Sequence, residues 1–354
     1  MNVAGSIPTF GDGMLKFAEF HVMVEKSIFI SFKNGTHSPP QIIRSEKAVK
    51  IMVQITENKL IAKSERVKAV DFHSSESLFA TALHNGSLEL WDSMSQTLIK
   101  RIQASEKPLR SVKFIPNTEW VATGGDDLSI HVYNYTTGTK VTSFAAHKDF
   151  IRSLTPHATK PYLLSCGDDK LVQMWDWSKD WTLVKSFEGH EHYVMQVVFN
   201  PLKADEFATA SLDQTARVWN LDSATPKFVL KGHSKGVNTV EFVKDWIVTG
   251  SDDTTIRVWS LADGACIQTL SNLHENNITT IAYHHNLDVF FTGGEDGKVL
   301  VMNGDTLAVE HQLEFGLERV WNAALLKNGE KAVFGCDAGS VSLVFRRGAG
   351  DALL

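Results

Sequence analysis

The ten residues SLDQTARVWN, from Ser211 to Asn220, decide the fold of this chain, because their pattern returns along most of its length. An acidic or amide residue stands six positions before a large apolar residue, here Asp213 before Trp219. The residues between them read as a tight turn followed by a short strand. The other copies of the pattern are LHNGSLELWD (83–92), GDDLSIHVYN (125–134), GDDKLVQMWD (167–176), SDDTTIRVWS (251–260) and GEDGKVLVMN (294–303).

The copies are evenly spaced, and the spacing defines a repeat. The large apolar residue recurs every 40–44 residues from Trp91 to Met302, and a weaker seventh copy runs from Arg319 to Phe345 with Asp337 as its turn residue. An apolar residue that opens an earlier strand lies 16–19 residues before each turn residue. These strand-opening residues are Val67, Leu109, Ile151, Val194, Val237, Ile278 and Val320.

Each repeat alternates apolar runs with Asp/Gly turns, which is typical of short antiparallel strands. Four strands at this period describe one blade of a β-propeller, and the pairs Gly189-His190 and Gly232-His233 are typical of WD repeats. We therefore predict an all-β fold, a seven-bladed WD-repeat β-propeller. The segment NKLIAKS (58–64) should add a strand to the last blade and close the ring, because closure removes exposed strand edges.

The repeats also predict the domain organisation. Residues 53–347 are expected to form the propeller, and residues 348–354 a short tail. Residues 1–52 do not share the period and form an N-terminal extension to which we assign no function. Its one apolar strand-like run is SIFISF (27–32).

Composition and charge exclude several classes of protein. The 354 residues include 35 Lys and Arg against 41 Asp and Glu, a net charge of −6, which argues against a nucleic-acid partner. No apolar run reaches the roughly 18 residues that a membrane helix needs, and no signal peptide is recognisable, so direct membrane insertion is not expected. Three widely separated cysteines, Cys166, Cys266 and Cys336, favour a reducing, cytosolic compartment.

The histidines and turn aspartates of the repeats are predicted to be structural. In a WD repeat His190 should bond the turn residue Asp213, and Trp219 with either Thr209 or Ser211 should complete the network. Zinc would need three or four convergent donors, which the spacing does not provide. No GxSxG, P-loop or dinucleotide motif is present. We expect no enzymatic activity, no cofactor and no metal site.

A propeller places equivalent positions of its blades around one channel, so the aligned repeats can be compared position by position. We call the residue after each strand-opening residue the first column and the residue before each turn residue the second column. In blade order the first column is Lys68, Arg110, Arg152, Met195, Asn238, Thr279 and Trp321. The second column is His84, Asp126, Asp168, Leu212, Asp252, Glu295 and Cys336.

The charges of the first three blades allow two interpretations. Arg66 lies two residues before Lys68, and Asp149 in the loop AHKDFIRS (146–153) should lie close to Asp168. In one interpretation the charges pair with one another, Arg152 with Asp149 for example, and form a solvated rim. In the other, separate basic and acidic groups bind a ligand with an anionic end and a cationic side chain, such as a peptide C-terminus with a nearby lysine.

Several stretches resemble the N-terminal propellers of coatomer beta-prime subunits. They include KSERVKAVDFH (63–73), WDWSKDWTLVKSFEGHEHYVM (175–195) and TPKFVLKGHSKGVN (225–238). The resemblance covers about Met52 to Phe345 and is far more specific than a general match to WD repeats. The paralogous coatomer alpha subunit is also similar, and HNGSLELWD is closer to it at His84.

The resemblance implies a cargo-binding function. Propellers of this family recognise C-terminal dilysine signals on membrane proteins that return from the Golgi to the endoplasmic reticulum in COPI-coated vesicles. Carried over by position, the groups that bind the tail's carboxylate are Arg66, Lys68 and Arg110. The groups that bind its lysine are Asp149 and Asp168, with His84 replacing an aromatic residue. Arg152 and Asp126 are additional candidates.

The resemblance also implies partners and a location. We expect contacts with the coatomer alpha subunit and other coat subunits, and a cytoplasmic protein held peripherally on Golgi membranes and COPI-coated vesicles. The alternative is a WD-repeat scaffold that docks another coat subunit or ubiquitin with the same face.

Overall fold

A computed structural model describes residues 20–24, 28–32, 41–44, 53–63, 65–326 and 329–347. The chain divides into two compact units, residues 1–51 with 349–354 and residues 52–348. In the first unit, β1 (Phe20–Val24), β2 (Ile28–Phe32) and β3 (Gln41–Arg44) form an antiparallel sheet in the order β1-β2-β3. The sequence patterns indicated only the middle strand, because this segment has no repeat to compare.

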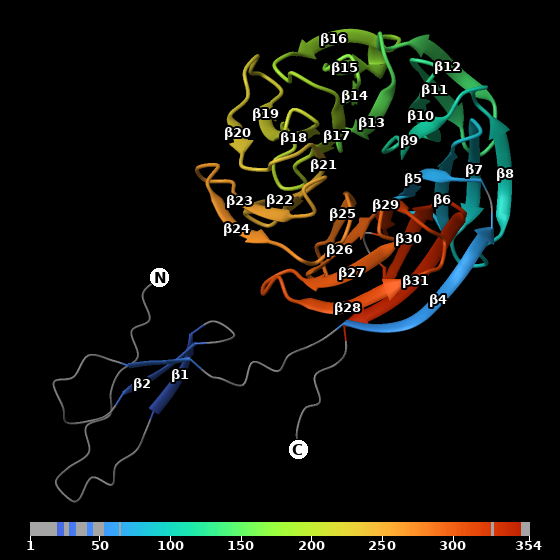
Figure 1. The fold of residues 1–354 in the computed structure, drawn as a ribbon. Coiled ribbons are helices and arrows are strands. Elements are labelled where there is room, and N and C mark those ends of the chain that lie inside the picture. Colours follow the sequence, from blue (N-terminus) through green and yellow to red (C-terminus); the bar gives the residue numbers. More distant parts are fainter. Residues whose placement is uncertain are drawn as a thin grey trace, which may run out of the picture. The chain divides into compact units, whose positions relative to one another are not determined.

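The second unit is the predicted propeller, in which seven four-stranded antiparallel sheets form a ring (Figure 1). The innermost strands contact one another around the whole ring, and each begins at the strand-opening residue predicted from the repeat. These inner strands are β5 (Val67–Phe72), β9 (Leu109–Phe114), β13 (Ile151–Pro156), β17 (Val194–Phe199), β21 (Val237–Val243), β25 (Ile278–His284) and β29 (Val320–Leu325).

The second and third strands of each blade flank the turn that carries the Asp or Asn landmark. The second strands are β6 (Leu78–Leu83), β10 (Trp120–Gly125), β14 (Tyr162–Gly167), β18 (Glu206–Ser211), β22 (Trp246–Ser251), β26 (Val289–Gly294) and β30 (Lys331–Cys336). The third strands are β7 (Ser87–Asp92), β11 (Ser129–Asn134), β15 (Val172–Asp176), β19 (Thr215–Asn220), β23 (Ile256–Ser260), β27 (Lys298–Asn303) and β31 (Gly339–Arg347).

The outermost strands complete the blades, and a short 3-10 helix, η1 (Trp177–Lys179), precedes one of them. In blade order they are β8 (Leu98–Gln103), β12 (Lys140–Ala145), β16 (Thr182–Phe187), β20 (Phe228–Lys231), β24 (Cys266–Leu270), β28 (Val309–Glu314) and β4 (Val53–Lys63).

The ring closes as predicted, because β4 from the start of the propeller pairs antiparallel with β31 from its end. Figure 1 shows β4, in blue, beside the red strands of blade seven. The pairing extends from Lys63 opposite Gly339 to Val53 opposite Arg347. The strand begins at Val53, so it is longer at its start than the predicted segment 58–64.

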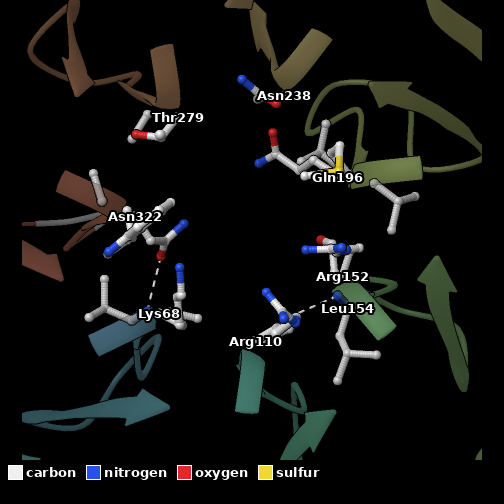
Figure 2. A pocket seen from close by; sticks show the side chains of 18 of the residues that line it. Lys68, Arg110, Arg152, Leu154, Gln196, Asn238, Thr279 and Asn322 are labelled. Atoms are coloured by element: carbon white, nitrogen blue, oxygen red, sulfur yellow. Dashed lines mark hydrogen bonds between the residues drawn. The ribbon is translucent and has the colours of Figure 1, made fainter. Parts of the chain in front are cut away.

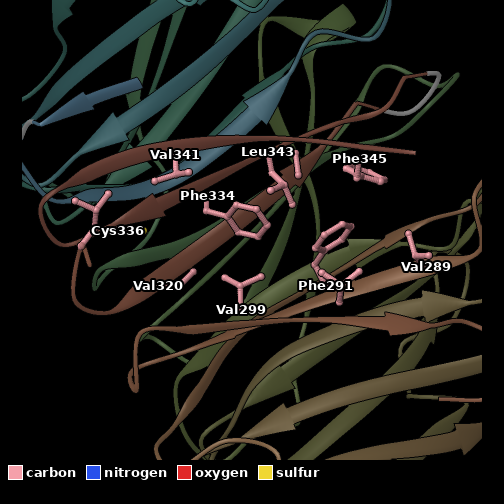
Figure 3. Packing of buried hydrophobic residues seen from close by; sticks show 12 residues of the cluster. Val289, Phe291, Val299, Val320, Phe334, Cys336, Val341, Leu343 and Phe345 are labelled. Carbon is pink, nitrogen blue, oxygen red and sulfur yellow. The ribbon is translucent and has the colours of Figure 1, made fainter. Parts of the chain in front are cut away.

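The hydrophobic core lies between neighbouring blades. Where blade six meets blade seven, Phe291, Phe334 and Phe345 are fully buried and pack together (Figure 3). Burial of one such side chain contributes about 1.5–3 kcal/mol. Similar clusters join the other blades, so the blades stabilise one another around the closed circle.

The network predicted for blade four is present, and Thr209 rather than Ser211 completes it. His190 Nδ1 lies 2.7 Å from Asp213 Oδ2, and His190 Nε2 lies 2.7 Å from Thr209 Oγ1. The Trp219 indole donates to the same hydroxyl at 3.0 Å. Blades three and five contain the same arrangement in the sets His147, Asp169, Ser165 and Trp175, and His233, Asp253, Thr249 and Trp259. These histidines are therefore structural.

Candidate site at the mouth of the central channel

A β-bulge in every blade directs the first-column side chain into the central channel. In blade one Val67 pairs with Leu83 and Ala69 with Ala82, so Lys68 is the extra residue between them. The pairing shifts at the same position in the other six blades. A bulge re-aims a side chain, and all seven first-column residues line one channel of about 400 Å³. Figure 2 shows Lys68, Arg110 and Arg152 from three successive blades.

Side-chain hydrogen bonds between blades fix the wall of this channel. The backbone N–H of Val70 donates to Asn322 Oδ1 at 3.0 Å, and that of Leu154 donates to Ser111 Oγ at 2.9 Å (Figure 2, dashed lines). These bonds satisfy inner-strand groups that no strand covers. These bonds hold the inner strands, and the channel-facing residues on them, in fixed positions relative to one another. We call the end of the ring at which the inner strands begin the rim.

First-column and second-column residues of one blade pair with each other. In blade three, Arg152 Nε and Nη2 each lie 2.6 Å from an oxygen of Asp168. In blade two, Arg110 makes the same two-point contact with Asp126, with 2.8 Å between Nη2 and Oδ2. The cations and acids of these blades are therefore paired and not separated, and the partner of Arg152 is Asp168, not the Asp149 named in the pairing interpretation.

Blade one differs, because His84 occupies the second-column position that is Asp in blades two and three. Among the described residues, no carboxylate lies within ion-pair distance of Lys68 Nζ. The ammonium instead lies 3.0 Å from the centre of the Trp321 ring. Burial, together with the charges of Arg66 and Arg110, lowers the pKa of Lys68 to about 7. Lys68 is thus a half-buried amine without a direct ion-pair partner in the described part of the chain, and the nearby carboxylate of Asp337 offsets only part of the effect of burial and of the neighbouring cations.

Arg66 is held by blade seven. Its Nε lies 2.5 Å from Asp337 Oδ1, and its side chain remains about one third exposed. Asp337 also accepts hydrogen bonds from Arg319 Nε and from the Trp321 indole, both at 2.7 Å. Burial alone would raise the pKa of Asp337, but these bonds and the two guanidinium charges lower it, so the carboxylate is ionised. Arg66 therefore contributes a cation beside Lys68 but is not itself among the residues that line the channel.

His84 brings an unpartnered ring nitrogen to the same cluster. Its backbone N–H donates to the carbonyl of Arg66 at 2.9 Å, while its Nδ1 is buried and has no hydrogen-bond partner. Burial lowers the pKa of His84, and the charges of Arg66, Lys68 and Arg110 lower it further. The imidazole is therefore neutral near pH 7, and its unpartnered Nδ1 is enclosed by protein atoms.

Asp149 lies in the loop before β13. Its Oδ1 accepts the backbone N–H of Phe150 at 2.8 Å, and no cation among the described residues forms an ion pair with it. The Phe150 ring centre lies 5.5 Å from Arg110 Cζ. Asp149 is thus a partly exposed acid next to the paired charges of blade two.

The sequence comparison assigned no role to Trp321 or Asp337. Both belong to the weak seventh repeat, and both contact residues that lie more than 250 positions earlier in the chain. The available signal was the first column itself, in which Trp321 is the one aromatic residue. Adjacency of blades seven and one in a closed ring would have placed it beside Lys68.

The described part of the chain offers neither a metal site nor a membrane-spanning helix. No group of three or more His, Cys, Asp or Glu side chains there could hold a metal ion. Among the same residues, no helix has the length and apolar character to cross a membrane.

Comparison with known proteins agrees with the resemblance. The chain is 41% identical to the coatomer subunit beta' of Rattus norvegicus over 287 residues, and equally so to that of Homo sapiens. It is 43% identical to coatomer subunit beta'-1 of Arabidopsis thaliana over 293 residues. These alignments cover 80–82% of this chain and 32% of each relative. The chain therefore spans about a third of the length of the curated relatives it matches.

A family model also matches the repeats directly. The model described as WD domain, G-beta repeat matches residues 56–92, 96–134, 138–176, 181–220, 224–260 and 264–303. These segments contain the first six turn landmarks, and the fold of the ring agrees with them. The chain therefore belongs to the WD-domain, G-beta repeat family, as a seven-bladed propeller whose relatives include the beta' subunits of coatomer.

Proposed function

We propose that this propeller is a cargo-recognition module of a COPI vesicle coat and binds C-terminal dilysine signals of membrane proteins at the rim. The observation that carries the proposal is Lys68, a channel-facing amine that has no carboxylate within ion-pair distance among the described residues and is flanked by Arg66 and Arg110. A half-buried cation without a direct ion-pair partner favours the entry of an anion. The terminal carboxylate of a peptide has the size and charge to be this anion.

The three cations have different roles in this proposal. Lys68 supplies the charge that the carboxylate neutralises. Arg110 already satisfies Asp126, and Arg66 already contacts Asp337, so each offers the tail only its remaining N–H groups. Both guanidinium groups nevertheless add positive potential, because their charges lower the pKa of Lys68.

The lysine of the tail is proposed to lie over blades two and three. Asp149 has no cationic partner among the described residues, and it provides the available acceptor charge. Asp168 is bound to Arg152 through both oxygens, so it accepts an additional hydrogen bond only through its remaining lone pairs. The neutral His84 is proposed to contact this lysine with the exposed part of its ring, since Nδ1 is buried.

The wider setting is part of the same proposal, and the similarity to coatomer beta' subunits supports it. A propeller of this kind acts in the cytoplasm as a peripheral component of the coat on Golgi membranes. It acts together with the alpha and other coatomer subunits in transport from the Golgi to the endoplasmic reticulum. Its role is binding and not catalysis.

Calorimetric titration with a peptide that ends in Lys-Lys-x-x tests the proposal. A free-acid peptide should bind, and its C-terminal amide should bind at least tenfold more weakly, because the amide cannot neutralise Lys68. Increasing salt should weaken the binding of the free acid. Equal binding of both peptides, or no binding, would contradict the proposal and leave the scaffold alternative, in which this face docks a coat subunit or ubiquitin.

A pair of matched variants locates the lysine subsite. Asp149→Asn should weaken the binding of the free-acid peptide, and it should have little effect on a peptide whose lysines are replaced by alanine. Asp252→Asn is the control, because Asp252 is also a rim acid but lies in blade five and contacts Asn238. A larger effect of the blade-five variant would move the lysine to the other side of the channel.

A further inference from the structure

Blade seven contributes an aromatic ring to the cation cluster at the rim. Trp321 is the bulged residue of β29, and it lines the channel with the other first-column residues. Three cations surround its ring. The centre of the ring lies 3.0 Å from Lys68 Nζ, 4.9 Å from Arg319 Cζ and 5.7 Å from Arg66 Cζ. A tryptophan face attracts cations because of its quadrupole.

A buried acid fixes the orientation of this ring. The Trp321 indole N–H donates to Asp337 Oδ1 at 2.7 Å, and the side chain of Asp337 is only 5% exposed. The other oxygen of Asp337 accepts from Arg319. Rotation of the indole would therefore remove one hydrogen bond from Asp337 Oδ1 and leave it the contact with Arg66 Nε.

The ring takes the place of the missing acid of blade one. In blades two and three the first-column cation is held and neutralised by the second-column Asp, whereas Lys68 faces His84. The Trp321 face attracts the ammonium but carries no net charge. The position of Lys68 is thereby held while its charge is only partly offset, by an Asp337 carboxylate that is not within ion-pair distance.

We propose that Trp321 is a positioning residue of the carboxylate site, which holds the Lys68 ammonium at the channel wall so that the terminal carboxylate of a bound tail becomes its counter-ion. The inference rests on the proposed function and extends it to blade seven. It also fits the lack of a direct ion-pair partner for Lys68 among the described residues, because an acid in contact with the ammonium would compete with the ligand.

Tail binding by channel variants tests the proposal. Trp321→Leu should weaken the binding of a free-acid Lys-Lys-x-x peptide about tenfold, as expected for loss of a cation–π contact in a desolvated site. The same variant should not change the weak binding of the amidated peptide. Trp321→Phe keeps an aromatic face and should retain most of the preference for the free acid. Met195→Leu, at the equivalent position of blade four, should behave like the wild type.

A second measurement leaves Trp321 in place and does not depend on the stability of the leucine variant. In protein labelled with 5-fluorotryptophan, the ¹⁹F resonance of Trp321 is assigned by its loss in Trp321→Phe. Lys68→Met should shift this resonance more than those of the other eight tryptophans. The free-acid peptide should also shift it in the wild type, and the amidated peptide should not.

The outcomes separate the two proposals. If the wild type prefers the free acid and Trp321→Leu keeps the same preference and affinity, the role of Trp321 is overturned while the proposed function stands. An unchanged Trp321 resonance in Lys68→Met would overturn it as well. If the wild type binds neither peptide or both equally, the proposed function fails, and the positioning role fails with it.

Discussion

Arg152 and Asp168 hold each other at two points on the wall of blade three, with 2.6 Å between Nε and Oδ1 and between Nη2 and Oδ2. The side chain of Asp168 is 4% exposed and that of Arg152 is 19% exposed. Removal of one partner from such a pair leaves the other charge poorly solvated. The pair therefore supports the structure of the rim, whatever Asp168 also does for a ligand.

We predict that Asp168→Leu lowers the free energy of unfolding by about 2–3 kcal/mol, toward the lower end of the range for buried pairs because Arg152 is partly exposed. The double variant Arg152→Met/Asp168→Leu should recover most of this loss, since no charge remains unpaired. Urea unfolding of the two single variants and the double variant forms the cycle that checks this. If the losses of the two single variants add up to the loss of the double variant, the two side chains have no interaction free energy.

The position of His84 predicts how the carboxylate site can be blocked. His84→Asp should give Lys68 an acidic partner like the one that Arg110 has in blade two. Blade five shows that the two columns lie close enough, because even the short side chain of Asn238 reaches Asp252 at 2.7 Å. The new acid should weaken binding of a free-acid tail at least tenfold by calorimetry. His84→Asn has the same size without the charge, and its effect should stay within about threefold. Comparable losses in both variants would argue against an anion site at Lys68.

Tail binding should depend on pH through Lys68. The pKa of Lys68 is about 7 in the free protein, and a bound carboxylate favours the charged amine. Affinity for the free acid should therefore be constant between about pH 5.5 and 6.5 and should fall by up to tenfold per pH unit above about 7. Calorimetry in two buffers of different ionisation enthalpy should detect the uptake of up to one proton at pH 7.5.

Lys68→Arg provides the control for this linkage, since a guanidinium does not lose its proton in this range. His84 does not contribute to the fall above about pH 7, because burial and the neighbouring cations lower its pKa from the ordinary value. A pH profile that is the same in the wild type and in Lys68→Arg would assign the dependence to another group.

The amine of Lys68 should also reduce stability. The folded-state pKa of Lys68 is lowered from 10.5 to about 7, so the unfolded chain binds more protons than the folded protein between pH 7 and 10.5. The free energy of unfolding therefore rises with pH across this range, and the full destabilising effect of Lys68 is present below about pH 7. Lys68→Met should therefore stabilise the protein at pH 6 by about 0.5–2 kcal/mol. The gain should shrink as the pH rises from 7 toward 10. Urea unfolding at the two ends of this range measures the difference, and a gain independent of pH would indicate packing alone.

The structural networks offer a comparison between blades four and six. Thr209 donates its hydroxyl hydrogen to His190 Nε2, because Nδ1 of the neutral ring bonds Asp213, and it accepts from the Trp219 indole. In blade six Thr292 has the histidine partner, His274, but Met302 occupies the position of the tryptophan and supplies no indole donor. Thr209→Val should lower the free energy of unfolding by about 2–3 kcal/mol, and Thr292→Val by about 1–2 kcal/mol. Thr→Ser variants at both positions keep the hydroxyl and serve as controls in chemical denaturation. Equal losses would mean that the indole donor contributes little.

The fold was largely predictable because the repeat encodes it several times. The turn residue and the strand-opening residue recur in register, so an error in one copy is corrected by the others. Val67 and Val320 begin inner strands as predicted, although the seventh repeat is weak. The strands β1 and β3 of the first unit were missed for the opposite reason, since nothing elsewhere in the chain resembles them.

The site was only partly predictable, because the columns identify the residues but not their partners. The comparison placed Arg110 and Arg152 on one wall, and both line the channel. It did not show that each binds the acid sixteen residues later, which depends on how the bulge directs the side chain. Reading both columns along each blade would have revealed these pairs, and it would have identified Lys68 as the cation without one.

The pairing of β4 with β31 determines where additional polypeptide can be attached. The two strands meet at the rim through Lys63 and Gly339, and they separate at Val53 and Arg347, about 25 Å away along strands of this length. Both connections therefore leave blade seven from the side opposite the mouth of the channel. A protein fused at either of these strand ends is therefore joined about one strand length from the cation cluster of the rim, so the junction itself replaces no residue of that cluster.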